Sequence, residues 1–175
     1  NLAFDQESDE PVTGIVVSKY ETGETREKGE YIDGLREFEW KEFHQNGTVK
    51  STINYKNGFK EGPFEIYFED GRIKALGNYI KGLEDGNWQE FSNEGNFLYI
   101  GNYNQGNLNG RWQTFHLNGR LFSMGNFIEG KKEGLWEEYQ GNLYLKGMYD
   151  NDLKEGIWEI FDENRKLQFK GTYIN

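Results

Sequence analysis

Aromatic residues recur along the chain at a fixed spacing. The first aromatic column advances in steps of 24 residues, with a final step of 22, through Trp40, Phe64, Trp88, Trp112, Trp136 and Trp158. A second column follows three residues later, at Phe43, Tyr67, Phe91, Phe115, Tyr139 and Phe161. A third column comprises Tyr31, Tyr55, Tyr79, Tyr103, Phe127, Tyr149 and Tyr173. Three columns in one register indicate tandem repeats, the pattern to establish before any other.

Glycines separate these aromatic positions and predict the turns. A glycine stands two positions before most members of the first column, at Gly62, Gly86, Gly110, Gly134 and Gly156. Most members of the third column are preceded in the same way by Gly29, Gly77, Gly101, Gly125, Gly147 and Gly171. Further glycines and asparagines lie between the strands, where they accept the positive φ of hairpin turns. Each repeat therefore predicts two short strands and two turns.

The period is too short for a βαβ crossover, and no segment shows an adequate 3.6-residue apolar period. The sequence predicts an all-β fold, an elongated, twisted single antiparallel β-meander of about seven tandem hairpin repeats of about 24 residues. The repeat array covers residues 14–175, and residues 1–13 are an acidic, flexible lead-in.

An even period keeps each column on one face of the sheet. The first two columns are three residues apart, so either both faces carry aromatic rings or a bulge turns one column back. A further column is always apolar and is expected to be buried: Val49, Ile73, Phe97, Leu121, Leu143 and Leu167.

Composition narrows the function. The formal net charge of −10 argues against nucleic acid and acidic membranes as partners and favours a basic protein partner. The chain has no cysteine, which excludes thiol chemistry, and no apolar run long enough to span a bilayer. The non-Met start, the missing cysteine and the polar, aromatic composition favour an exported or cell-envelope protein over a cytoplasmic one.

The candidate chemistry is sparse. His44 and His116 share one column that is otherwise variable, which is typical of a surface position near a turn. The segment 150–156 resembles a calcium loop, but Lys154 occupies an expected ligand position. Carboxylate pairs arise by chance among thirty acidic residues. We therefore expect no catalytic, cofactor-binding or metal-binding residues, and no enzyme.

Aromatic side chains carry the binding hypotheses. Part of the ladder, if exposed, would suit a protein interface or sugar stacking. The candidate interaction ladder is Tyr55, Tyr79, Trp88, Tyr103, Trp112 and Trp136. Charged loops, such as Lys60–Glu61 and Lys131–Glu133, either provide solubility or select a partner. We expect a protein-binding or scaffold module, with an envelope carbohydrate-binding module as the alternative. Two copies could also pair through an open sheet edge as a homodimer.

The repeat also resembles a known family. Segments 86–91 (Gly-Asn-Trp-Gln-Glu-Phe) and 101–106 (Gly-Asn-Tyr-Asn-Gln-Gly) are similar to MORN repeats, particularly the bacterial variant of YwqK-family antitoxins. The resemblance implies an elongated, twisted sheet of hairpins that serves as an interaction or scaffold region. It also implies a toxin-like protein as the partner to be neutralised.

Overall fold

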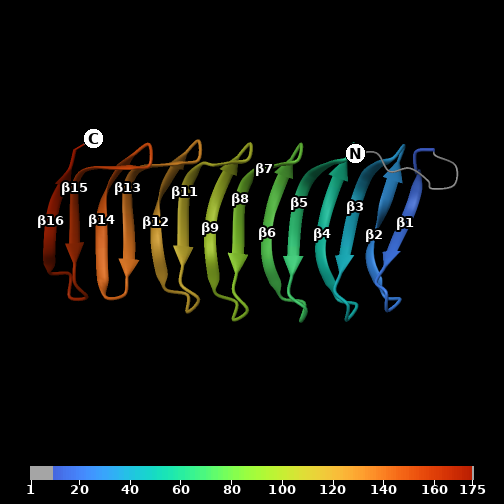
Figure 1. Ribbon diagram of the computed structural model, residues 1–175, viewed down its shortest axis with the longest axis horizontal. Helices are drawn as coiled ribbons and strands as arrows, with labels where there is room; N and C mark the ends of the chain where they lie inside the picture. The colour runs from blue at the N-terminus through green and yellow to red at the C-terminus, as the bar shows by residue number, and fades with distance from the viewer. Residues whose placement is uncertain (1–9, 175) are drawn as a thin grey trace. The chain divides into compact units, whose positions relative to one another are not determined.

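The structure is a computed structural model that describes residues 10–174 and divides into two compact units, Asn1–Asp85 and Gly86–Asn175. Every element within the described range is a β-strand (Figure 1). Most of the predicted lead-in, residues 1–9, lies outside that range. Of the remainder, Val12 O accepts a hydrogen bond of 2.8 Å from Gly34 N.

Each unit is a meander in which consecutive strands pair in antiparallel fashion. In the first unit the strands are paired in the order β1 to β6, and β7 pairs with β6. These strands are β1 (Gly14–Lys19), β2 (Thr25–Ile32), β3 (Leu35–Phe43), β4 (Val49–Lys56), β5 (Phe59–Tyr67), β6 (Ile73–Ile80) and β7 (Leu83–Glu84).

In the second unit the order is β8, β9, β11 to β16, and β10 pairs with β9. These strands are β8 (Gly86–Phe91), β9 (Phe97–Asn104), β10 (Asn107–Leu108), β11 (Gly110–Phe115), β12 (Leu121–Ile128), β13 (Lys131–Gln140), β14 (Leu143–Asp150), β15 (Leu153–Phe161) and β16 (Leu167–Tyr173). Three hairpin repeats in the first unit and four in the second confirm the predicted antiparallel meander of seven.

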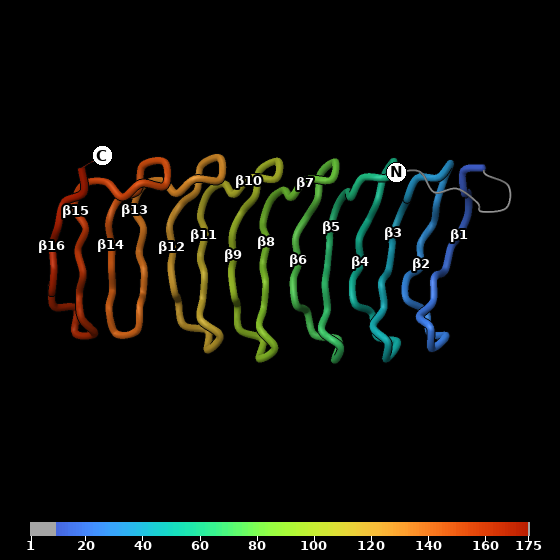
Figure 2. Tube along the Cα trace, in the orientation of Figure 1, coloured from blue at the N-terminus to red at the C-terminus, as the bar shows by residue number. Residues whose placement is uncertain are grey.

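Two kinds of turn alternate along the chain, as the Cα trace in Figure 2 shows. The turns that connect repeats have positive φ at both central residues, the requirement of a type I′ turn. They are Asp33–Gly34, Asn57–Gly58, Lys81–Gly82, Gln105–Gly106, Glu129–Gly130 and Asn151–Asp152. The turns inside most repeats are longer and carry a bulge, as between Glu90 and Phe91. The repeat that precedes the 22-residue step is two residues shorter in this turn and lacks the bulge, so that Tyr139 pairs directly with Tyr144.

A second bulge precedes Trp40, Trp136 and Trp158, and also Phe64 of the same column. Between β12 and β13, Met124 pairs with Glu137 and Asn126 pairs with Glu133, so that Gly125 alone faces residues 134–136. Gly134 has φ of 70°, a conformation that glycine adopts without steric cost. This bulge brings the indole of Trp136 over Gly125 of the preceding strand.

Both faces of the sheet carry aromatic rings, which settles the alternative left open by the sequence. The register between β13 and β14 is unbroken from Gly134 to Gln140, so alternation places Trp136 and Tyr139 on opposite faces. We call the side with the tryptophan column the Trp face. The core lies there, and its largest fully buried side chain is Trp136.

The expectation for the apolar column was wrong. Ile73, Phe97, Leu143 and Leu167 are exposed, and Val49 and Leu121 are only half-buried. These residues lie at the internal turns, where a single sheet has no second layer to cover them. Their invariable apolar character reflects local packing within the hairpin, as between Phe91 and Phe97, whose ring centroids are 4.8 Å apart.

Candidate functional site

The rings of the Trp face contact one another from repeat to repeat. In the first unit Tyr31 of one repeat packs edge-on against Trp40 of the next at a centroid distance of 4.9 Å. Within single repeats Tyr55 packs against Trp40 at 6.2 Å, and Tyr79 against Phe64 at 5.5 Å. In the second unit an unbroken series of edge-on contacts runs through Trp88, Tyr103, Trp112, Phe127, Trp136, Tyr149 and Trp158. Neighbouring repeats therefore shield one another's rings from water.

The predicted interaction ladder lies within this series. Tyr79, Trp88 and Trp136 are buried, whereas Tyr55, Tyr103 and Trp112 keep part of their surface exposed. Trp112 also stacks on Tyr99, with centroids 5.1 Å apart and planes inclined by 15°. These six side chains form core contacts, and their use in binding stays a prediction.

The charged residues of the connecting loops make two kinds of structural contact: cations lie over aromatic rings, and carboxylates accept hydrogen bonds from the turns. Lys132 Nζ lies 4.3 Å from the Trp136 ring centroid, and Lys154 Nζ lies 4.0 Å from that of Trp158. Arg36 covers Trp40 in the same way at 3.9 Å. The residue directly after the cation supplies a carboxylate that accepts a hydrogen bond from a backbone N–H of the following turn. Examples are Lys81 N to Glu61 Oε2 at 2.7 Å and Asn151 N to Glu133 Oε2 at 3.1 Å.

The two histidines connect repeats. His44 Nε2 donates to Tyr67 O at 3.1 Å, and His116 Nε2 donates to Tyr139 O at 3.4 Å. Tyr20 occupies the same column and donates to Phe43 O at 2.6 Å. Tyr20, His44 and His116 thus tie their internal turns to the next strand pair, which is a structural task.

The segment resembling a calcium loop forms a turn. Asp152 Oδ1 accepts from Lys132 N at 2.7 Å, and Asp150 Oδ1 accepts from Asn151 Nδ2 at 2.7 Å. Within residues 10–174, no group of three His, Asp or Glu side chains is arranged to hold a metal ion. In the same range, no helix has the length and apolarity needed to cross a membrane.

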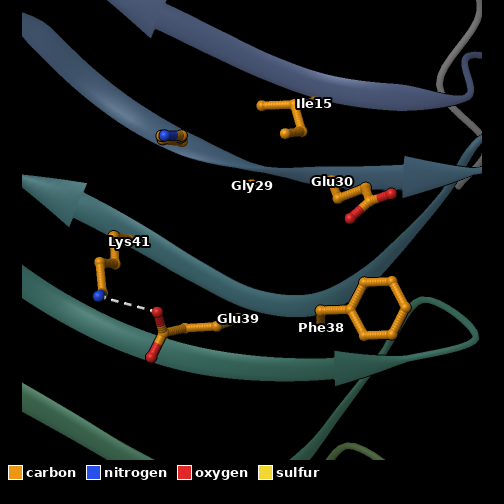
Figure 3. Close-up of a pocket in the computed structure, with 7 residues that line it drawn as sticks. Ile15, Gly29, Glu30, Phe38, Glu39 and Lys41 are labelled. Atoms are coloured by element: carbon orange, nitrogen blue, oxygen red, sulfur yellow. Dashed lines mark ion pairs between the residues drawn. The ribbon is translucent and has the colours of Figure 1, made fainter.

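A surface hollow in the first unit is a stronger candidate for a binding site (Figure 3). It has a volume of about 270 Å³ and is lined by Ile15, Lys28, Gly29, Glu30, Phe38, Glu39 and Lys41. Ile15 comes from β1, and Phe38 from β3. Their side chains are 69% and 57% exposed, although both are large and apolar. Lys41 Nζ pairs with Glu39 Oε1 at 2.8 Å beside them.

Phe38 differs from the residues at the same position in the other repeats. It stands two residues before Trp40, where every other repeat has glycine: Gly14, Gly62, Gly86, Gly110, Gly134 and Gly156. Its φ of 59° lies in the left-handed region, which a bulky side chain rarely adopts. Neither Phe38 nor Ile15 is among the residues predicted from the sequence to bind a partner. The available signal was the single aromatic residue in a column of glycines.

Consecutive hairpins and a shared ring ladder define a tandem-repeat β-protein. The MORN repeat variant matches the chain at residues 36–57, 60–81 and 154–175. These matches support a MORN repeat protein, and MORN repeats are non-enzymatic modules that commonly bind proteins or membranes. No curated protein matches the chain in sequence.

Proposed function

We propose that this protein is a non-catalytic protein-binding module whose first unit docks a partner on the hollow between Ile15 and Phe38. The observation that carries the proposal is Phe38. A left-handed conformation costs a residue with a Cβ roughly 1–2 kcal/mol. Every other repeat avoids that cost with glycine, so folding does not call for a phenylalanine here. Strain kept at an exposed aromatic residue is typical of a contact surface.

The partner we propose is a protein with an apolar side chain for the hollow and a basic surface around it. The formal net charge of −10 attracts such a surface and speeds its encounter with the module. Neutralisation of a toxin-like protein is the specific form of this function, and the resemblance to YwqK-family antitoxins supports it.

A carbohydrate-binding module is the second candidate, because sugars also stack on an exposed aromatic face such as that of Phe38. The protein partner is favoured, since the hollow combines two apolar side chains with paired charges. Among residues 10–174, Phe38 is the only aromatic residue that lines this hollow.

The experiment places a photo-crosslinking amino acid at Ile15 in cells that produce the protein. The matched control is the same amino acid at Asn87, an exposed polar residue in the column of Ile15. We expect one reproducible protein adduct at position 15 and none at position 87. The adducted protein, once purified, should bind the unmodified chain about tenfold more tightly than it binds Phe38→Gly.

Phe38→Gly should also keep its fold, because glycine occupies that position in every other repeat. Equal affinity of wild type and Phe38→Gly, or identical adducts at positions 15 and 87, would contradict the proposed surface. Saturable binding on a glycan array that is lost in Phe38→Gly would favour the carbohydrate alternative.

A further inference from the structure

The face opposite the Trp face changes character in the last two repeats. The position before the tryptophan is Glu39, Asn87 or Arg111 in earlier repeats, but it is Leu135 and Ile157 here. The residue after the supporting glycine is an asparagine at Asn78, Asn102 and Asn126, but it is Met148 here. Leu135, Met148 and Ile157 are 51%, 44% and 50% exposed. The fold accepts polar residues at these positions, so it does not require the apolar ones.

These three residues form a row across neighbouring strands. Leu135 of β13 and Met148 of β14 are direct cross-strand partners. Across β14 and β15, Met148 pairs with Glu155, and Ile157 lies two residues further along β15 at the bulge. Ile157 in turn pairs with Thr172 of β16. Leu135, Met148 and Ile157 all lie on the face opposite the Trp face, because Leu135 and Ile157 each directly precede a buried tryptophan.

A second row on the same face alternates in charge. Glu137 pairs with Lys146, Lys146 with Glu159, and Glu159 with Lys170, one residue from each of β13 to β16. Lys146 Nζ lies 3.3 Å from Glu159 Oε2, and Lys170 Nζ lies 3.0 Å from Glu159 Oε1. The hydrogen bonds from Lys170 and Lys146 lower the pKa of Glu159, so this carboxylate stays ionised in the row.

A row with the signs −, +, −, + becomes its own complement when it is reversed. A two-fold axis parallel to the strands and midway between β14 and β15 produces that reversal in a face-to-face pair of sheets. It would set Glu137 of one copy against Lys170 of the other, and Lys146 against Glu159. The same axis sets β14 of one copy against β15 of the other, so that Met148 lies against the segment from Glu155 to Ile157, and it sets β13 with Leu135 against β16 with Thr172.

From this pattern we propose that the face of β13–β16 opposite the Trp face binds a second copy of this chain in an isologous two-fold dimer. Isologous contacts require a self-complementary patch, which these two rows provide. The equivalent row in the first unit, Lys28, Lys41, Thr52 and Glu65, does not reverse into its complement. The proposal concerns the second unit and does not depend on the hollow at Phe38.

Charge reversal tests the dimer on the full chain. One variant, Lys146→Glu with Lys170→Glu, carries only negative charges in the row. Another, Glu137→Lys with Glu159→Lys, carries only positive ones. Sedimentation should find dimers of the wild type and monomers of each variant alone. An equimolar mixture of the two variants should form a heterodimer, a result that a misfolded variant cannot give.

A second pair of variants tests the apolar row. Leu135→Arg should abolish the dimer, and its fold should persist because Arg111 occupies the same column. Asn87→Arg, in the same column on β8, should leave the dimer intact. A wild type that is monomeric up to about 1 mM would overturn the proposal. Dimers that persist in Leu135→Arg would also overturn it, and would point to pairing through a sheet edge.

Discussion

The indole of Trp136 lies over Gly125, and a Cβ at residue 125 would overlap the ring. Trp136 Nε1 donates to Asn126 O at 3.2 Å, which holds the ring in place beside the glycine. The same relationship recurs between Trp40 and Gly29, Trp112 and Gly101, and Trp158 and Gly147. A single-layer sheet thus buries its largest side chains by laying each one on the bare backbone of the preceding strand.

This contact makes Gly125→Ala a destabilising substitution although it adds only one methyl group. The Trp136 ring, only 1% exposed, has no open space into which to move, so overpacking should cost about 2–3 kcal/mol. Urea denaturation of the full chain measures the loss. The control is Asn126→Ala at the next residue, an exposed position that should change stability by less than about 0.5 kcal/mol. Equal effects of the two substitutions would contradict the role assigned to Gly125.

Ile53 and Phe64 replace the glycine and the tryptophan of this contact in one repeat. They are direct cross-strand partners, and they occupy the glycine and tryptophan columns of their repeat. The ring of Phe64 is smaller than an indole, and Ile53 beneath it is larger than glycine, so the two changes compensate in volume. We expect Phe64→Trp alone to lose about 1–3 kcal/mol through overpacking, and Ile53→Gly alone to lose about 2–4 kcal/mol through a cavity.

The double variant Ile53→Gly with Phe64→Trp rebuilds the arrangement found in the other repeats. It should recover part of the combined loss, with a coupling free energy of about 1–3 kcal/mol from a double-mutant cycle. Denaturation of the four proteins in parallel gives that coupling. Strictly additive losses would show that the two positions do not share one packing constraint.

The repeat columns predicted the strands, the turns and the ladder because each depends on local spacing. Spacing could not predict how closely the rings would be covered. The bulge opposite Gly125 and the cation above Trp136 both depend on strand pairing, which the period alone does not fix. Three of the six residues proposed as an interaction ladder are therefore buried.

The hollow escaped prediction for a different reason. The repeat columns show which residue type recurs at each position, whereas Phe38 is the one residue in its column that is not glycine. Its positive φ also became visible only with the backbone conformation. Leu135, Met148 and Ile157 escaped in the same way, since apolar residues in strands are expected to be buried.

Substitution of Lys132 tests how much the cation over the Trp136 ring stabilises the fold. Its Nζ lies 4.3 Å from the Trp136 centroid, 4.8 Å from the Tyr149 centroid and 3.7 Å from Glu138 Oε1. Lys132→Met keeps the aliphatic stem and removes the charge, which should cost about 1 kcal/mol in thermal or urea unfolding. The adjacent Lys131→Met removes an exposed charge and should cost less than about 0.5 kcal/mol. An unchanged stability of Lys132→Met would show that the cation does not stabilise the buried Trp136 ring.

Tyr67 provides a test by titration. Its hydroxyl donates a hydrogen bond to Glu65 Oε2, and this bond, with burial and the Glu65 charge, raises the pKa of Tyr67 from 10.0 to about 12. Because the folded-state pKa exceeds the unfolded one, the stabilising contribution is complete below about pH 10. It is lost as the pH rises through about 12.

Glu65→Gln removes the charge and weakens the acceptor, so the pKa of Tyr67 should fall back toward 10. NMR of isotope-labelled tyrosine follows the single ring, with Glu69→Gln as an exposed control in the same hairpin. The wild type should lose stability between pH 10 and 12 more steeply than Glu65→Gln does. An unchanged titration of Tyr67 in Glu65→Gln would contradict the role of Glu65 and assign the raised pKa to burial and the charge of Glu39.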